Sequence, residues 1–189
     1  MIADHEPLWP TPPDFHLAGL HLREFLPGDE QAWFDYLHLP EVARSTGWNI
    51  ASPEELLPLT ARTPGEPVVR FVLADGANRL VGTIGFFDWR DGQAEIAYDL
   101  APPWWGKGIA SEACAALCRW AGEQGGLQLI KANVLTDNRA SARVLEKCGF
   151  EWQGTVRQGR HPDGIVRDYR VYRWSNRRSA GQPGGPDCD

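Results

Sequence analysis

The 189-residue sequence predicts a mixed α/β domain of the α+β class, built around a mostly antiparallel sheet. Two observations support this prediction. Three short runs rich in alternating or β-branched apolar residues follow one another within residues 67–100, which is typical of an antiparallel meander. A helical segment then leads from the third run, at 93–100, to a fourth at 127–135. Because a strand–helix–strand crossover makes its two strands parallel, we expect 93–100 and 127–135 to form a parallel pair.

The composition limits the kind of protein and its partners. Hydrophobic residues make up 42% of the chain and charged residues 23%, which is ordinary for one globular domain. A net charge of −6 argues against nonspecific nucleic-acid binding, which needs a basic face. The sequence has neither an apolar run long enough to span a membrane nor a secretion signal in residues 1–7. We therefore expect a cytoplasmic protein without nucleic-acid or membrane partners.

The chain divides into three segments by composition. Residues 1–17 carry four prolines and are expected to form an extended N-terminal lead-in. Residues 18–174 contain the patterned runs and are expected to form the domain. Residues 175–189 are rich in glycine and proline and offer little apolar surface for packing, so this tail is expected to be disordered.

The first part of the domain is expected to hold one strand and two helices. Residues 20–26 alternate between apolar and polar side chains, as a half-buried strand does. A helix is expected from Asp29 to about Leu39, because its apolar residues fall on one face. Residues 52–55 read Ser-Pro-Glu-Glu, a capping box with proline at the first helical position, which predicts a short second helix. Residues 46–49 are expected to be a loop.

The remaining elements follow from turn and cap signals. Within the meander, Gly82 and Gly85 interrupt the second strand, which predicts a bulge or a close neighbour. Asp137-Asn138 has the character of an N-cap, and Gly149 that of a helix stop. The expected elements are strands at 67–74, 79–87 and 93–100, a helix at 111–124, a strand at 127–135, a helix at 139–147, and a closing hairpin of 150–158 and 165–174 around a turn at 161–164.

The four cysteines do not form a recognisable metal site. Cys114 and Cys118 are four residues apart and share a helix face, whereas Cys148 and Cys188 stand apart. Two neighbouring thiols without two further ligands do not hold zinc. We expect small buried helix residues in a reducing compartment, and no metal.

The stretch between residues 104 and 113 follows a strand, contains two glycines and opens a helix. The free amides and the dipole of a helix N-terminus make such a turn an anion site, usually for phosphate. Gly106 and Gly108 lack side chains and would let a pyrophosphate approach closely, with the amides of 106–111 as donors. The alternative is an ordinary strand-to-helix turn, which also uses glycine.

Two motifs in this chain resemble those of the GNAT superfamily of acetyl-CoA-dependent N-acetyltransferases. Residues 105–110, Trp-Gly-Lys-Gly-Ile-Ala, are similar to the family's pyrophosphate turn at Gly108 and Ala110, and depart from it at Trp105. Residues 138–150 look like the Asn-x-x-Ser…Leu-Glu-Lys-x-Gly-Phe segment of the RimJ/RimL-like branch. The resemblance covers roughly residues 18–174.

The resemblance implies a GNAT-like fold and a place for acetyl-CoA. The fold would have about seven strands and about four helices, with the parallel pair splayed to admit the pantetheine arm. Asn138 would bond the pantetheine, or would serve as a plain N-cap. Lys107 would add charge at the phosphates, or would be solvated, and the role of Trp105 is open. The implied cofactor-binding residues are Tyr98, Asp99, Leu100, Trp105, Gly106, Lys107, Gly108, Ile109, Ala110, Ser111, Asn138 and Ser141.

The departing thiolate must receive a proton during acetyl transfer. Many members of the family use a tyrosine of the helix at 139–147, but the matching position is Leu145, which cannot donate one. The RimJ/RimL-like branch has a serine instead, and Ser141 occupies that position. We expect Ser141 to donate, directly or through water; the alternative is a hydroxyl with a capping role in the first helical turn.

The base that accepts the amine proton is expected to be Glu95. Glu95 and Asp99 lie four residues apart on one strand, so both side chains point to the same sheet face. The alternative for Glu95 is an ordinary exposed strand carboxylate. The ribosomal-protein branch would place a carboxylate near residues 158–161, and none is there, which weighs against a ribosomal-protein acceptor.

The sequence thus predicts an N-acetyltransferase in which a primary amine attacks acetyl-CoA directly in a ternary complex. The acceptor would be a protein N-terminal amine or a small-molecule amine, with Trp48, Trp89 and the first helical region as its walls. The alternative from another class is a protein of the same fold that binds acyl-CoA as a sensor or scaffold without turnover. A homodimer through a sheet edge or the closing hairpin is possible, and nothing in the sequence requires it.

Overall fold

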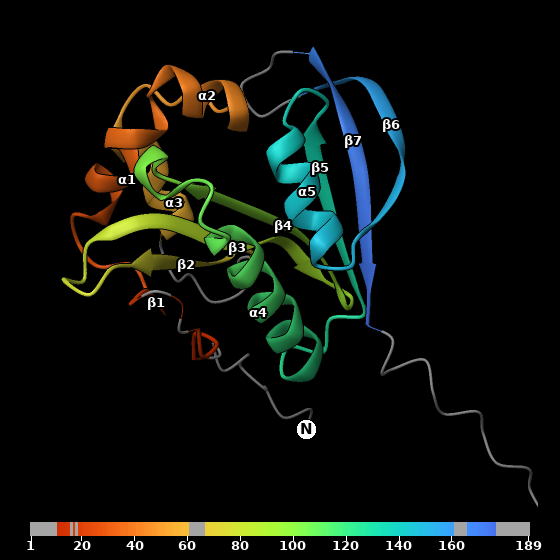
Figure 1. The fold of residues 1–189 in the computed structure, drawn as a ribbon, viewed down its shortest axis with the longest axis horizontal. Coiled ribbons are helices and arrows are strands. Elements are labelled where there is room, and N and C mark those ends of the chain that lie inside the picture. The colour runs from red at the N-terminus through yellow and green to blue at the C-terminus, as the bar shows by residue number, and fades with distance from the viewer. Residues whose placement is uncertain (1–10, 16, 18, 61–66, 161–165, 177–189) are drawn as a thin grey trace, which may run out of the picture.

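The fold is described from a computed structural model, which defines residues 11–15, 17, 19–60, 67–160 and 166–176. Within these residues a single seven-stranded sheet has the order β1-β2-β3-β4-β5-β7-β6 (Figure 1). The strands are β1 (His21–Arg23), β2 (Val69–Ala74), β3 (Leu80–Arg90), β4 (Gln93–Leu100), β5 (Leu129–Leu135), β6 (Glu151–Arg160) and β7 (Val166–Ser175). The helices are α1 (Asp29–Leu37), α2 (Pro40–Thr46), α3 (Leu57–Thr60), α4 (Ile109–Glu123) and α5 (Arg139–Lys147), with short 3₁₀ turns at Pro53–Leu56 and Pro102–Trp104.

The predicted meander and the predicted parallel pair are both confirmed. Strands β2, β3 and β4 pair antiparallel in sequence, and β5 then lies parallel to β4. The other neighbouring pairs of the sheet are antiparallel. The parallel pairing runs only from Gln93–Leu129 to Glu95–Lys131. Beyond that point β4 and β5 diverge, so the second half of β4 presents a backbone edge that β5 does not cover.

The two faces of the sheet carry different layers. Successive residues of a strand point to opposite faces, and on β4 the Tyr98 side chain reaches Ser141 on α5, whereas the Asp99 side chain reaches Trp33 and Tyr36 on α1. Helices α4 and α5 therefore cover one face at β4, and α1 covers the other (Figure 1). Two separate groups of buried side chains fill these layers, one under α4 and α5, and one between α1, α2 and the residues that follow.

Close packing of the meander accounts for its glycines. A Cβ atom on Gly85 would lie 2.2 Å from the Val69 carbonyl oxygen, and one on Gly82 would lie 2.6 Å from that of Asp99. Both distances are shorter than real Cβ contacts allow. The expectation of a close neighbour is confirmed at both glycines. A register shift of the β2–β3 pairing also lies beside Gly82, since Leu73 pairs with Gly82 and Ala74 with Leu80, whereas Gly85 has no such shift beside it.

The sequence-based boundaries differ from the structure near Pro40 and Gly108. The first helix ends at Leu37, and Pro40 begins a separate helix, α2, because proline is accommodated in a first helical turn. The expected helix at 111–124 begins two residues earlier, since Gly108 adopts a left-handed conformation and acts as its N-cap. The short helix predicted after Ser52 is a 3₁₀ turn that continues into α3.

The chain ends of the expected domain lie partly outside the described residues. Strand β7 extends to Ser175, and the Asn176 amide donates to the Gln128 carbonyl at 2.9 Å. Residues 1–10 of the expected lead-in, residues 177–189 of the expected tail with Cys188, and the turn expected at 161–164 are not among the described residues. Cys114, Cys118 and Cys148 are free thiols, the first two buried. No described helix is long and apolar enough to cross a membrane.

Candidate active site

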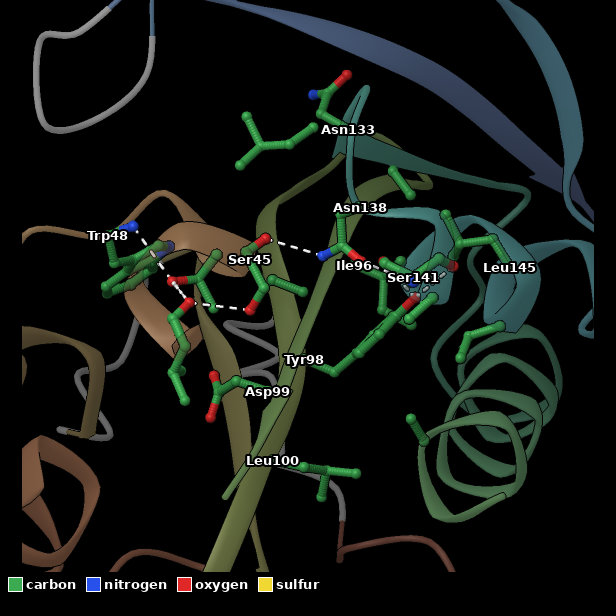
Figure 2. Close-up of a pocket in the computed structure, with 18 of the residues that line it drawn as sticks. Ser45, Trp48, Ile96, Tyr98, Asp99, Leu100, Asn133, Asn138, Ser141 and Leu145 are labelled. Atoms are coloured by element: carbon green, nitrogen blue, oxygen red, sulfur yellow. Dashed lines mark hydrogen bonds between the residues drawn. The ribbon is translucent and has the colours of Figure 1, made fainter. Parts of the chain in front are cut away.

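A cavity of about 1260 Å³ opens where β4 and β5 part (Figure 2). It is bounded by both diverging strands, by α2 with the residues after it, by the turn before α4 and by α5. Every residue that the sequence singled out for cofactor binding or catalysis lines this cavity: Glu95, Tyr98, Asp99, Leu100, Trp105, Gly106, Lys107, Gly108, Ile109, Ala110, Ser111, Asn138 and Ser141.

The hydrogen bonding of β3 to β4 decides which peptide groups face the cavity. The Ala101 amide donates to the Val81 carbonyl at 2.9 Å, and hydrogen-bonded pairs alternate with non-bonded pairs along an antiparallel ladder. The backbone groups of Asp99 therefore point to Thr83 on β3, whereas those of Tyr98 and Leu100 point away from β3 into the gap. The Leu100 carbonyl accepts the Trp105 indole N–H at 2.7 Å, so this carbonyl already has a donor.

The turn before α4 has the form of an anion site. Gly106 and Gly108 have φ angles of 73° and 78°, in the left-handed region that favours glycine. Gly108 caps α4 without a side-chain hydrogen bond, and the first amides of the helix have no partner within the helix. The Ile109 side chain is buried in the core at 1% exposure, so only its backbone is available to a ligand.

The side chains of this turn have contacts of their own. The Lys107 ammonium lies 4.9 Å from the centre of the Trp104 ring, in a cation–π contact. The Trp105 ring is 42% exposed and ties the turn to the end of β4 through its bond to Leu100. The departure from the family motif at Trp105 therefore has a structural role in holding the turn against the strand.

The charges that line the cavity are sorted by sign. The cations Lys107, Arg143 and Lys147 belong to the turn and to α5. Three of the acids belong to the 3₁₀ turn after α2, to β3 and to the first half of β4, namely Glu55, Asp88 and Glu95. The fourth, Asp99, lies at the end of β4 and is paired with Arg70. An anionic ligand is therefore favoured at the turn and a cationic one at the opposite end.

Asp99 is placed differently from the expectation that it contacts a cofactor. Its carboxylate accepts hydrogen bonds from Trp33 at 3.0 Å, from Thr83 at 2.9 Å, from Arg70 at 2.6 Å and from Tyr36. The Arg70 and Asp99 side chains are only 2% and 6% exposed. Since its backbone is committed to β3 as well, Asp99 serves as a buried anchor of α1 on the sheet.

Glu95 lies on the face of β4 that carries Asp99, as expected, but the donors that surround the Asp99 carboxylate do not contact it. Burial raises the pKa of Glu95, and the nearby charge of Asp88 raises it further. A hydrogen bond from Asn133 and the charge of Lys131 act in the opposite direction, and the net shift is upward. A carboxylate with a raised pKa that lines a cavity is a stronger proton acceptor than an ordinary glutamate.

Ser141 and Asn138 meet at the start of α5. The Asn138 Oδ1 atom accepts the Ser141 amide at 3.0 Å, which is the N-cap bond. The Asn138 Nδ2 atom donates to the Ser45 carbonyl of α2 at 2.8 Å (Figure 2), and both residues line the cavity. The Ser141 hydroxyl lies 2.9 Å from the Tyr98 hydroxyl. Leu145, where the family often has tyrosine, is fully buried in the core.

Several residues with a part in the site escaped the sequence reasoning. The contact of the Tyr98 hydroxyl with Ser141 is not predicted, because the resemblance implies only backbone contacts for Tyr98, and Ser45 lies 93 residues from its partner. Arg70 gave a signal that could have been used, since it interrupts an otherwise apolar strand. Trp89, expected as an acceptor wall, packs on Phe86 and Trp120 at ring-centre distances of 5.4 and 6.0 Å. It does not line the cavity, whereas Trp48 does.

Within the described residues, no group of three or more His, Cys, Asp and Glu side chains is placed to hold a metal ion.

Comparison with known proteins gives a family match across most of the chain. A model of the acetyltransferase (GNAT) domain matches residues 19–151. The uncharacterized N-acetyltransferase YoaA of Bacillus subtilis (strain 168) is 40% identical over 95 residues, which are 49% of this chain and 54% of YoaA. The putative ribosomal N-acetyltransferase YdaF of the same organism is 32% identical over 113 residues, 59% of this chain and 61% of YdaF. The chain thus spans a little over half the length of these relatives.

A solved structure shares the fold. The spermidine N-acetyltransferase from Vibrio cholerae, solved in complex with CoA and spermine, superposes with a TM-score of 0.73 at 21% identity. The superposition covers 84% of this chain and 96% of that one.

Proposed function

Because the chain belongs to the GNAT acetyltransferase family, we propose that it moves an acetyl group from acetyl-CoA to a primary amine. The amine attacks directly in a ternary complex, and residues 18–174 form the unit that does so. The observation that carries this proposal is the early end of the β4–β5 pairing at Glu95–Lys131, beside a glycine turn that opens a helix. A gap in a sheet next to an anion site suits a long ligand with phosphates at one end.

The residues around the gap fit coenzyme A. The amides of 106–111 would bind the pyrophosphate, with Lys107, Arg143 and Lys147 contributing positive charge. The free peptide groups of Tyr98 and the Leu100 amide would pair with the pantetheine as a neighbouring strand does. When bound, acetyl-CoA supplies the thioester that is cleaved. The curated relatives named as N-acetyltransferases and the CoA-bound fold neighbour support this choice of ligand.

Two side chains at the inner end of the gap would handle protons. Glu95, with its raised pKa, accepts the proton that the attacking amine releases. Ser141 donates a hydrogen bond to the coenzyme sulfur as the thiolate departs, and the thiolate takes up its proton from Ser141 directly or through water. The alternative without turnover is motivated by the missing tyrosine at Leu145 and by the uncertain identity of the base. The hydroxyls of Ser141 and Tyr98 remove much of its motive, since both line the cavity.

The acceptor would enter from the side of the cavity that faces α2. This side carries Trp48, Asp88 and Glu95 and no lysine or arginine among the residues that the structure describes as lining it. Acidic and aromatic side chains favour an ammonium group. A small amine and a protein N-terminal amine both satisfy this requirement. The proteins similar to this chain include a putative ribosomal N-acetyltransferase, YdaF, and a spermidine N-acetyltransferase.

Two measurements in sequence test the function. Calorimetry should first show saturable binding of acetyl-CoA. Release of free thiol should then be followed with a panel of diamines, polyamines, aminoglycosides and short peptides with a free N-terminus. We expect thiol release that depends on at least one amine and yields the acetylated amine by mass spectrometry. Absence of binding would sink the whole proposal, and binding without transfer to any amine would favour the sensor or scaffold.

A further inference from the structure

The side chain of Tyr98 has a contact that none of the roles above requires. Its hydroxyl lies 2.9 Å from the Ser141 hydroxyl and donates to the Ser141 carbonyl at 3.2 Å. It reaches α5 from β4, and both Tyr98 and Ser141 line the cavity (Figure 2). We propose that Tyr98 is a positioning residue, which turns the Ser141 hydroxyl hydrogen toward the coenzyme sulfur. This inference rests on the proposed acetyl transfer.

The pair has two possible hydrogen-bond arrangements. In the first, Tyr98 donates to the Ser141 carbonyl, and Ser141 gives its own hydrogen to Tyr98. In the second, Tyr98 donates to the Ser141 hydroxyl oxygen, and the Ser141 hydrogen is free to point into the cavity. The carbonyl of a residue in a first helical turn accepts an amide four residues later, so it does not need Tyr98 as a donor. The second arrangement therefore leaves no backbone group unsatisfied.

The second arrangement also makes Ser141 a better donor. A hydroxyl that accepts one hydrogen bond polarises the bond that it donates, and the effect is larger in a site of low dielectric constant. An electron-rich sulfur in the cavity selects this arrangement, because only this arrangement offers it a hydrogen. The Ser141 hydroxyl is thus preorganised for the charge that develops on the sulfur.

Tyr98 keeps its own proton in this role. Burial and the neighbouring Cys114 thiol raise the pKa of Tyr98 well above its ordinary value, while the bond to Ser141 lowers it somewhat. The phenol therefore stays neutral and remains a donor at all working pH values. No proton leaves Tyr98, and no bond to it is made or broken.

The surrounding structure holds the phenol in place. Tyr98 pairs with Ile84 across the β3–β4 ladder, and its neighbour Asp99 is fixed on the opposite face by donors from Trp33, Arg70 and Thr83. A strand anchored on one face cannot roll, so the side chain on the other face keeps its direction. The N-cap bond from Ser141 to Asn138 fixes the partner in the same way.

The test is a double-mutant cycle read on the bound coenzyme. The thiolate of coenzyme A absorbs in the ultraviolet, so the protonation of the bound thiol can be titrated without an acceptor. Tyr98→Phe should shift that titration to higher pH and lower the acetyl-transfer rate roughly tenfold, the effect of one hydrogen bond. Ser141→Ala should do more, and the Tyr98→Phe/Ser141→Ala double variant should match Ser141→Ala alone.

Tyr172→Phe is the matched control. The Tyr172 hydroxyl also reaches α5, where it donates to Glu146 at 3.0 Å, and Tyr172 does not line the cavity. This variant should leave the thiol titration unchanged. A fluorinated tyrosine at position 98 keeps the shape and strengthens the donor, so it should shift the thiol titration to lower pH even if Tyr98→Phe folds poorly.

The outcomes separate this inference from the proposed function. The positioning role would be overturned if the Tyr98→Phe and Ser141→Ala substitutions had additive effects on the transfer rate. It would also be overturned if neither phenylalanine nor fluorinated tyrosine at position 98 shifted the pH of the thiol titration. A thiol titration that behaves as expected without acetyl transfer to any amine would leave the Tyr98–Ser141 pair in place and reject turnover.

Discussion

Two acids four residues apart on β4 have opposite fates, and their neighbours decide which. Asp99 is surrounded by donors from α1, β2 and β3, and these saturate its oxygens. Glu95 has the Asn133 side chain as a hydrogen-bond partner and lines the cavity where the strands part. The alternation of side chains along a strand places both acids on one face. Which of them is a buried anchor and which can act as a base depends on the side chains that the fold packs against each.

Glu95→Gln tests the base. The carboxylate accepts a proton only when it is ionised. Because its pKa is raised, the transfer rate should begin to fall on acidification at a higher pH than for an ordinary glutamate. We expect the rate of wild-type chain to fall as the pH drops through this raised pKa. The Glu95→Gln variant should be roughly a hundredfold slower, and its rate should no longer show this fall at low pH. The measurement is the pH profile of the transfer rate at saturating acetyl-CoA.

The stability of the same variant has a defined sign. A carboxyl whose pKa is raised by folding stabilises the fold below its unfolded pKa, and this contribution is lost as the pH rises through the folded value. At neutral pH the ionised Glu95 therefore costs stability, and Glu95→Gln should melt no lower than wild type. Glu41→Gln, at an exposed acid of α2 outside the cavity, is the control.

A Glu95→Gln variant that keeps the full transfer rate and the same fall of the rate at low pH would exclude Glu95 as the base.

At the scale of elements, local patterns predicted the strands β2 to β7 and the helices α4 and α5 to within a few residues, because their signals lie within the elements themselves. The strand expected at 20–26 is shorter, since only His21–Arg23 pairs as β1. The run at 93–100 and the helix at 139–147 match β4 and α5. The helix α2 was missed, since its start signal is one proline directly after another helix. The contacts of Asp99, Asn138 and Tyr98 could not be predicted, because each joins segments that only the folded sheet brings together.

The turn before α4 gives the clearest prediction for an element. Gly108→Ala places a side chain at a φ of 78°, where L-residues are strained by about 1–2 kcal/mol, although no atom within 4 Å obstructs the new Cβ. Relief of this strain would tilt the amides that start α4. We expect a small loss of stability and a fall of roughly tenfold in coenzyme A affinity, measured by calorimetry.

Gly28→Ala provides the matched comparison. Gly28 has a φ of 94°, caps α1 without a side-chain bond and has no atom within 4 Å of a new Cβ. Its substitution should cost a similar amount of stability and leave coenzyme affinity unchanged. Equal affinities of the two variants would show that the turn at 106–108 is not where the coenzyme binds.

On the scale of the whole molecule, two contacts connect the elements that surround the gap between β4 and β5. The Arg70–Asp99 pair fixes α1 and β2 to β4 inside the protein. The Asn138–Ser45 bond links the start of α5 to α2, and both residues line the cavity. These two contacts, the Arg70–Asp99 pair and the Asn138–Ser45 bond, therefore stabilise the elements on both sides of the gap between β4 and β5.

Asp99→Asn should weaken the whole fold. The substitution removes the negative charge that compensates the buried Arg70 guanidinium, and breaking a buried ion pair from one side costs roughly 3–5 kcal/mol. Denaturant unfolding would measure this loss. Asp88→Asn removes an acid whose partner Arg90 is 65% exposed, and should cost less than about 1 kcal/mol. Similar losses for the two variants would contradict the anchoring role of Asp99.

The most direct measurement is a crystal structure of this chain with bound coenzyme A. We predict that the pyrophosphate oxygens lie within hydrogen-bonding distance, about 3 Å, of the amides of 106–111. The pantetheine should run along the open edge of β4 beside Tyr98, and the sulfur should come to rest next to the Ser141 hydroxyl. Coenzyme density outside the gap between β4 and β5, or a sulfur remote from Ser141, would contradict the account.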